Sequence, residues 1–326
     1  MLTAYCLPLT FLLMTATASQ ALDIQGHRGA RGLAPENTLP AFAKALELGV
    51  STLELDCAIT RDGVVVVSHD PVLNPDITRG PDGKWLQQTG PAIRSLNYQE
   101  LQRLDVGRIN PASAYAQRWP EQRPVDGTRI PRLADLFALV RKSGNETVRF
   151  NIETKISPLA PGETTTPDVF ARELVGAVRK AGMADRTAIQ SFDWRTLAVV
   201  QKEAPEIPTV YLTSVSGFMD NIQMMGDSPW TAGHRVRDHG GSIPRTIRAA
   251  GGAVWSPYLG DLTREAVREA QALGLKVVVW TVNDPAGMRR MIEWGVDGVI
   301  SDRPDLLRKV AGEMGVTLPR PTPVIP

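Results

Sequence analysis

The chain has 326 residues, of which 43% are hydrophobic and 22% charged, and its formal net charge at pH 7 is +1. These proportions are typical of a globular protein with a large buried core, and the length fits one large α/β domain or two ordinary ones. The balanced charge provides no broad basic surface, so we expect neither a nucleic-acid nor a membrane partner.

Residues 1–21 differ from the rest of the chain. The run from Leu7 to Met14 is mostly apolar, and small residues follow it up to Ala21. This order is typical of a cleaved signal peptide, so we predict that residues 1–21 are removed and that the protein is exported to the periplasm. The apolar run is too short to span a bilayer, and we expect no stable membrane insertion of the mature chain. No Lys or Arg precedes the run, which leaves a frayed or misassigned start as the alternative.

Strand-like and helical patterns then alternate to the end of the chain. Eight short segments predict parallel strands, at residues 24–27, 51–58, 148–155, 187–192, 208–212, 253–256, 276–281 and 298–301. Apolar spacing predicts helices between them, the first from Leu39 to Gly49 and the clearest others at 167–181, 194–203, 264–273 and 285–294. Eight strands separated by helices predict an α/β fold, a (β/α)₈ TIM barrel over residues 22–318, with a Pro-rich tail at 319–326.

One further strand and two long segments depart from the barrel repeat. Residues 64–67 follow a turn of only four residues, so this strand must run antiparallel to 51–58 as an added hairpin. The segments at about 71–127 and 213–252 are expected to be insertions over the C-terminal face of the barrel. In the second insertion, we expect His234 and His239 to be surface residues or core residues with satisfied hydrogen bonds. We expect the apolar residues of this insertion to pack on the top of the barrel, and an apolar rim for the substrate is the alternative. These residues are Met219, Met224, Met225 and Trp230.

Three carboxylates are expected to meet inside the barrel. Glu54 and Asp56 are two residues apart on a predicted strand and therefore project to one side, whereas Cys57 packs on the other. Glu153 stands near the C-terminal end of the next barrel strand, where TIM barrels place their active sites. Buried carboxylates repel one another unless a cation lies between them, and an all-oxygen ligand set suits one Ca²⁺ or Mg²⁺. Neutralisation by basic side chains without a metal is the alternative.

Two histidines and two basic residues complete this candidate site. His27 and His69 each follow a predicted strand, and imidazoles there can accept and donate protons near neutral pH. Arg28 and Lys155 are predicted to bind a phosphate, one through its planar fork and the other as a compact charge. These residue types fit the metal-assisted cleavage of a phosphodiester. The sequence has no Gly-x-Ser-x-Gly elbow and no reactive cysteine, so it does not favour a covalent enzyme intermediate.

Other side chains are weaker candidates. Contacts with a substrate, by stacking on its carbons or bonding near its phosphate, are predicted for Phe192, Trp280 and Gln190. Core packing is the alternative for the two aromatic residues. A supporting role near the site is predicted for Glu36, whereas Asn37 is expected to cap the first helix and Asp302 to brace the last loop.

The order of several short motifs resembles one enzyme family. The motifs are Gly26-His27-Arg28-Gly29, Pro35-Glu36-Asn37-Thr38, Glu54-Leu55-Asp56, Asp62-Gly63, Ser68-His69-Asp70, Glu153-Thr154-Lys155, Gln190-Ser191-Phe192, Trp280-Thr281-Val282-Asn283 and the run from Asp297 to Pro304. Together they span nearly the whole mature chain and resemble the glycerophosphodiester phosphodiesterases.

This resemblance implies hydrolysis of a small glycerophosphodiester to sn-glycerol 3-phosphate and an alcohol. It implies that Glu54, Asp56 and Glu153 hold the divalent cation, and that His27 and His69 perform acid–base catalysis. It also implies a route in which the glycerol 2-hydroxyl attacks phosphorus and forms a cyclic phosphate. Two alternatives stay open, namely a related phosphodiesterase acting on lysophospholipids and an exported protein that binds glycerophosphodiesters without cutting them.

Overall fold

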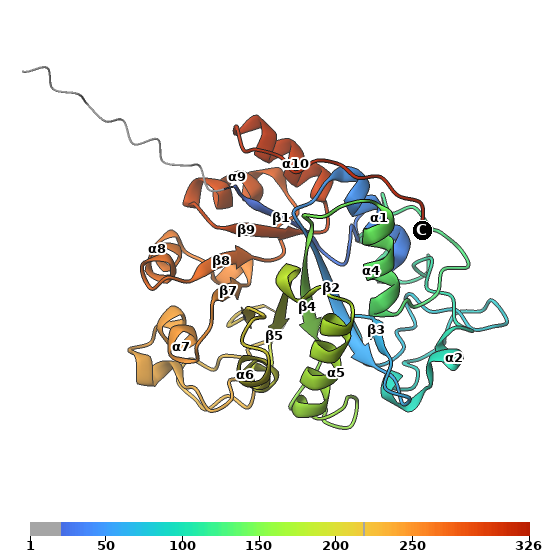
Figure 1. The fold of residues 1–326 in the computed structure, drawn as a ribbon, viewed down its shortest axis with the longest axis horizontal. Helices are drawn as coiled ribbons and strands as arrows, with labels where there is room; N and C mark the ends of the chain where they lie inside the picture. The colour runs from blue at the N-terminus through green and yellow to red at the C-terminus, as the bar shows by residue number, and fades with distance from the viewer. Residues whose placement is uncertain (1–20, 218) are drawn as a thin grey trace, which may run out of the picture.

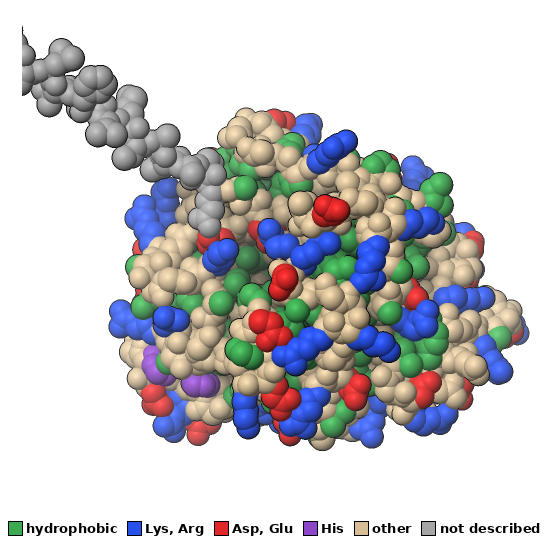
Figure 2. Space-filling view, viewed as in Figure 1, with side chains coloured by type: hydrophobic (Ala, Val, Ile, Leu, Met, Phe, Trp, Pro, Cys, Tyr) green, Lys and Arg blue, Asp and Glu red, His purple; other side chains and the backbone are tan. Residues whose placement is uncertain are grey.

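The computed structural model of the chain describes residues 21–217 and 219–326 (Figure 1). Except for Ala21, the predicted signal peptide lies outside the described residues, so its cleavage and the export of the protein stay predictions. Within the described ranges, no helix is both long and apolar enough to cross a bilayer. The face drawn in Figure 2 carries Lys and Arg side chains interspersed with acidic and apolar ones.

Parallel strands form a closed barrel at the centre of the fold (Figure 1). They are β1 (Asp23–Gly26), β2 (Thr52–Ile59), β4 (Arg149–Thr154), β5 (Thr187–Ser191), β6 (Thr209–Thr213), β7 (Val254–Pro257), β8 (Lys276–Val279) and β9 (Gly298–Ser301). The ring closes because β1 pairs with both β2 and β9. Every predicted barrel strand agrees with an observed one to within two residues, and the predicted (β/α)₈ barrel is confirmed.

Helices surround the barrel (Figure 1). They are α1 (Leu39–Leu48), α4 (Leu133–Lys142), α5 (Pro167–Lys180), α6 (Trp194–Glu203), α7 (Ile243–Ala249), α8 (Arg264–Ala272), α9 (Pro285–Trp294) and α10 (Pro304–Glu313). The five helices whose positions were predicted agree with α1, α5, α6, α8 and α9. Helix α7 lies inside the segment expected to be the second insertion, but it connects β6 to β7 as a barrel helix.

The register of β2 against β4 decides which side chains share the barrel interior. Glu54 lies opposite Asn151, and Asp56 lies opposite Glu153. Side chains alternate along a strand, so the intervening residues of β2 point outward. There Leu53, Leu55 and Cys57 are fully buried in the main apolar core, as predicted for Cys57, whose thiol is free.

The predicted hairpin strand is β3 (Val65–Val67), and it runs antiparallel to β2. After it, the first insertion forms η1 (Ile93–Ser95), α2 (Tyr98–Leu101) and α3 (Ala114–Gln117). A small apolar core joins this segment to β2 and β3. It consists of Ala58, Val66, Leu73, Ile93, Leu101, Leu104, Val106 and Ile130. The insertion is therefore packed onto the hairpin and can position side chains at the site.

The second insertion and the C-terminal tail also contact the barrel. Met219 and Trp230 of the insertion pack with Phe192 and Leu212 at the ends of the barrel strands. Three 3₁₀ turns lie in loops between barrel elements, namely η2 (Ala184–Arg186), η3 (Val236–His239) and η4 (Leu259–Asp261). The Pro-rich tail lies beside α1, where the Thr322 amide donates to the Leu46 carbonyl at 2.9 Å.

Candidate active site

A cavity of about 670 Å³ opens at the carboxyl ends of the barrel strands. Its polar side includes both predicted catalytic histidines, Arg28, Lys155 and two of the three predicted metal ligands, Glu54 and Glu153. Its apolar side includes Phe192, Leu212, Met219, Trp230, Tyr258 and Trp280. Both insertions contribute to the wall, the first through Tyr115 and Arg118 and the second through Met219 and Trp230.

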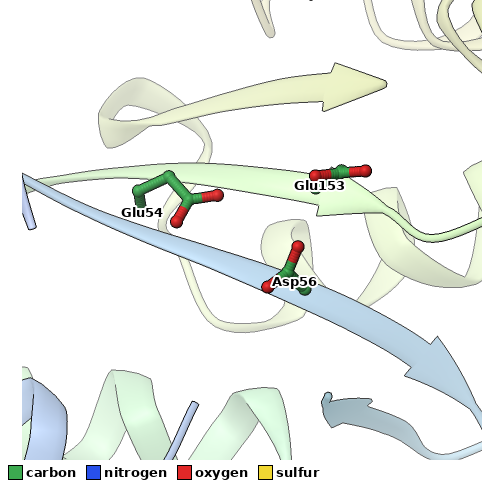
Figure 3. A group of neighbouring side chains, drawn as sticks. All are labelled: Glu54, Asp56 and Glu153. Carbon is green, nitrogen blue, oxygen red and sulfur yellow. The ribbon is translucent and has the colours of Figure 1, made fainter. Parts of the chain in front are cut away.

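The three predicted metal ligands converge at the base of this cavity. Glu54 and Asp56 extend from β2 and Glu153 from the neighbouring β4, and one oxygen from each lies within 4.8 Å of the others (Figure 3). All three side chains are buried. The register of β2 and β4 produces this cluster, because it sets Asp56 beside Glu153 on the interior face.

The first loop of the barrel is folded tightly over these carboxylates. A Cβ atom at Gly26 would lie 2.1 Å from the Gly29 carbonyl oxygen, and Gly29 has a φ of +85°. Only glycine is compatible with such a close approach and such a backbone conformation. The turn directs the Arg28 amide toward Glu54, whose Oε2 accepts its hydrogen bond at 2.9 Å. The Gly-His-Arg-Gly motif thus brings His27 and Arg28 onto the acidic cluster.

Basic side chains balance the cluster only in part. Lys155 Nζ lies 2.8 Å from Glu153 Oε1 and 3.7 Å from Asp56 Oδ1. Arg28 Nε lies 3.4 Å from Asp56 Oδ2. The same guanidinium also binds a fourth carboxylate, because Arg28 Nη1 lies 2.5 Å from Glu36 Oε1. Two basic side chains therefore face four carboxylates, which argues against neutralisation by basic residues alone.

The pKa values of the acidic residues reflect this imbalance. Burial, together with the charge of Asp56, raises the pKa of Glu54 well above its usual range, and burial raises the pKa of Glu153 to about 7. Burial would also raise the pKa of Asp56, but His69, Arg28 and Lys155 hold it well below its usual range. A divalent cation would stabilise the ionised form of all three groups.

The cluster fits a hard divalent cation. The buried Oδ1 of Asp56 has no hydrogen-bond partner, although it lies within the acidic cluster. Buried oxygens of this kind normally accept a hydrogen bond, and the neighbouring Lys155 Nζ lies too far away at 3.7 Å to donate one, so this oxygen is an available ligand atom. The donor set contains no thiolate or imidazole within the acidic trio, which favours Ca²⁺ or Mg²⁺ over Zn²⁺.

Two amide side chains hold the acidic residues in place. Asn37 Nδ2 donates to Asp56 Oδ2 at 2.8 Å, and the Asp56 amide donates to Asn37 Oδ1 at 3.3 Å. The prediction that Asn37 caps the first helix is wrong, because Thr38 Oγ1 accepts from the Ala41 amide and is the cap. Asn37 instead has a φ of 56°, which turns its side chain back toward β2.

Gln190, predicted to contact the phosphate, has a different set of partners. Its Nε2 donates to Glu54 Oε1 at 2.7 Å, and its Oε1 accepts from Asn151 Nδ2 at 2.9 Å. Because both ends of the amide are bound inside the barrel, Gln190 orients Glu54. Gln190 on β5 pairs in register with Glu153 on β4, so its side chain enters the same barrel interior as those of Glu153 and Glu54.

His27 is held by residues from the other end of the chain. Its Nδ1 lies 2.6 Å from Asp302 Oδ1, and its Nε2 lies 3.8 Å from Glu54 Oε2. Asp302 also accepts from Arg31 at 2.7 and 3.0 Å and from Asn283 at 2.7 Å. Asp302 therefore orients the His27 ring, a role beyond the loop bracing that the sequence suggested. Burial lowers the pKa of His27 to about 4, in spite of Asp302.

His69, in the bend that follows β3, has a similar arrangement. Its Nδ1 lies 2.7 Å from Asp70 Oδ1, and Asp70 is itself held by Asn74 Nδ2 at 2.7 Å. Burial and the charges of Arg28 and Lys155 lower the pKa of His69. In both histidines an aspartate binds Nδ1, which leaves Nε2 as the nitrogen that can exchange a proton.

The aromatic candidates form part of the apolar side of the cavity. The rings of Phe192 and Trp280 pack edge to face with centroids 5.4 Å apart. Trp280 Nε1 donates to the Ser256 carbonyl at 2.9 Å, so its ring is fixed in position. Both residues line the cavity and also pack with Leu212 and Trp230, so the packing alternative is confirmed, whereas their contact with a substrate stays a prediction.

Comparison with known proteins places this site in a family. Residues 27–306 match the profile of the Glycerophosphoryl diester phosphodiesterase family. The chain belongs to this family. Glycerophosphodiester phosphodiesterases from Caldanaerobacter subterraneus and Bacillus subtilis are each 29% identical to it, over 86% and 87% of this chain and 94% and 84% of their own. The chain is therefore an enzyme of the phosphoric diester hydrolase class.

Solved structures of the family share the fold. A crystal structure from Silicibacter pomeroyi superposes with a TM-score of 0.81 at 35% identity, and covers 92% of this chain and 96% of that one. A phosphodiesterase from Oleispira antarctica, solved with the product sn-glycerol-3-phosphate, has a TM-score of 0.65 at 21% identity, over 90% of this chain and 97% of its own. The second likeness concerns the fold only.

The contact between Asp302 and His27 leads to a prediction for this phosphodiesterase. Replacing Asp302 with Asn is expected to lower kcat by about a hundredfold, because an amide no longer fixes the tautomer and charge of the imidazole. Asp305→Asn is the matched control, since Asp305 pairs with Arg303 outside the site. Steady-state kinetics on both variants would test this, and equal kcat values for the two would remove Asp302 from the mechanism.

Proposed function

We propose that the protein hydrolyses small glycerophosphodiesters to sn-glycerol 3-phosphate and an alcohol, with one Ca²⁺ or Mg²⁺ held by Glu54, Asp56 and Glu153. One observation carries this proposal. Two imidazoles, each with its Nδ1 bound by an aspartate, share one cavity with a buried cluster of three carboxylates. The product named for the Oleispira antarctica structure, sn-glycerol-3-phosphate, is consistent with this substrate class.

The charged residues of the cavity fit a phosphodiester anion. When bound, the cation would offset negative charge on the phosphate oxygens and make an attacking hydroxyl more acidic. Arg28 and Lys155 add positive charge at the same end of the cavity, and both are held by acidic partners, so little side-chain entropy is lost on binding. This arrangement favours the developing charge of the transition state more than the ground state.

The histidines account for the proton transfers. One Nε2 accepts the proton of the glycerol 2-hydroxyl, whose oxygen forms a bond to phosphorus. The bond from phosphorus to the leaving alcohol breaks, and the other imidazole protonates the departing oxygen. Water then opens the cyclic phosphate by the reverse pattern of proton transfers, and this restores both imidazoles. No side chain has to act as a nucleophile.

The apolar side of the cavity supports a second candidate substrate class. Met219, Trp230 and Phe192 form a wall that a deacylated headgroup does not need. A lysophospholipid could place part of its acyl chain there, because burying each methylene from water contributes about 0.8 kcal/mol. A protein that only binds its ligand would not need two imidazoles held in this way, so the site favours the enzyme over the binding protein.

Removal of the cation tests the proposal. The protein is stripped with a chelator and given glycerophosphocholine, and glycerol 3-phosphate is measured before and after Ca²⁺ or Mg²⁺ is added back. We expect turnover to fall by about a hundredfold on stripping and to return with one of the cations. Lysophosphatidylcholine in parallel distinguishes the two substrate classes. Full activity after stripping would show that the acidic cluster has been misinterpreted.

A further inference from the structure

Tyr115 of the first insertion reaches the residues that are proposed to bind phosphate. It lies in α3, and its side chain lines the cavity. Its hydroxyl donates a hydrogen bond to Glu36 Oε2, whose other oxygen accepts from Arg28 Nη1 at 2.5 Å. Glu36 and Arg28 are both buried, so water competes little for these contacts. The position of Arg28 therefore depends on a residue far away in the sequence.

The same hydroxyl also reaches the residues that hold His27. Tyr115 accepts a hydrogen bond from Arg31 Nη1 at 3.3 Å. Arg31 binds Asp302 through two nitrogens, and its Nη2 lies 3.3 Å from His27 Nδ1. The Tyr115 hydroxyl thus connects Arg28 to His27. It donates to Glu36, which binds Arg28, and it accepts from Arg31, which contacts His27.

Neighbouring residues of the insertion hold Tyr115 against this loop. The Arg31 guanidinium lies over the Trp119 ring, 4.5 Å from its centroid. Gln122 Nε2 donates to the Arg31 carbonyl at 2.7 Å, and the Arg123 amide donates to the Leu33 carbonyl at 2.9 Å. Residues 113–123 are therefore docked on the first barrel loop by side-chain and backbone contacts, and the Tyr115 contacts are part of a built interface.

From these contacts we infer that Tyr115 is a positioning residue, whose hydroxyl keeps Arg28 and His27 in the geometry required for phosphodiester cleavage. The inference rests on the proposed function, because its main readout is turnover. Burial and the Glu36 charge raise the pKa of Tyr115 above its usual range, so the phenol stays a hydrogen-bond donor. The first insertion would then be part of the catalytic apparatus and not only a cover.

Tyr115→Phe tests this inference, because it removes the hydroxyl and keeps the ring. We expect kcat for glycerophosphocholine to fall about tenfold while KM stays within about twofold, since the lost contact orients groups that act in the transition state. The melting temperature should change by no more than about 2 °C. Tyr98→Phe is the matched control: Tyr98 lies in the same insertion at the start of α2, outside the cavity, and should leave kcat unchanged.

A second readout does not depend on turnover. The His27 Nδ1 proton, hydrogen-bonded to Asp302, should give a downfield proton NMR signal that is identified by its loss in His27→Ala. We expect Tyr115→Phe to shift this signal and Tyr98→Phe to leave it in place. In an active wild type, a Tyr115→Phe kcat within twofold of normal overturns the inference. If the wild type turns over no glycerophosphodiester, the proposed function fails, and a shifted or unshifted signal then supports or overturns the positioning role separately.

Discussion

Replacing His27 with Ala is expected to lower kcat for glycerophosphodiesters by about a thousandfold, within the range typical of a lost acid–base group. Substrate affinity should change little, because the imidazole is not among the groups proposed to bind phosphate. The ring lies between Asp302 and Glu54, so its removal leaves the acidic cluster and the two basic residues in place. Steady-state kinetics together with equilibrium binding of glycerol 3-phosphate would separate the two effects.

A second histidine provides the control for this experiment. His239 lies in η3 of the second insertion, away from the cavity, and His239→Ala should keep wild-type turnover. Unchanged turnover in His27→Ala would remove this residue from the mechanism. It would also favour the alternative of a protein that binds glycerophosphodiesters, because such a protein needs the charged residues but not the imidazole.

Replacing Glu153 with Gln is expected to weaken Ca²⁺ or Mg²⁺ binding by about a hundredfold and to lower kcat/KM by about a thousandfold. Glutamine keeps the size of the side chain but removes one of three anionic ligands. Calorimetric titration of the chelator-treated protein would measure the affinity, and kinetics at saturating cation would measure the remaining activity. Glu173→Gln on the exposed side of α5 is the control and should change neither quantity.

Stability distinguishes a lost ligand from a damaged fold. Burial raises the pKa of Glu153 to about 7, so at pH 8 its ionised form is less favourable in the folded protein than in the unfolded one. The metal-free Glu153→Gln protein should therefore melt at a temperature equal to or above that of metal-free wild type at pH 8. A large drop in melting temperature, or unchanged cation affinity, would contradict the assignment of Glu153 as a ligand.

Much of the candidate site could be predicted because its residues follow strand geometry. Glu54 and Asp56 share a face of one strand by the two-residue period, and Glu153 lies at the carboxyl end of the next barrel strand. Local rules are sufficient for such placements. The partners of these residues could not be predicted in the same way. Asn37 was assigned to a helix cap because the local pattern allows it, whereas its contact with Asp56 depends on the packing of the first loop on β2.

Asp302 and Tyr115 differ in whether their contacts could be inferred from the predicted barrel. A closed barrel puts the last strand beside the first, so the residue after β9 had to lie near His27, 275 positions away. That inference was within reach of the barrel prediction. The docking of α3 on the first loop was not, since it depends on contacts of Tyr115 with Glu36 and of Trp119 with Arg31, which join segments far apart in the sequence.

The amino-acid sequence alone determined the strand and helix periods, the antiparallel hairpin and the face of each strand, because these depend on contacts between residues close along the chain. The tertiary structure decided which side chains hold His27 and the acidic residues in position. Those contacts join segments that meet only when the barrel has closed and the insertion has packed. No local sequence pattern specifies which residues of such distant segments come into contact.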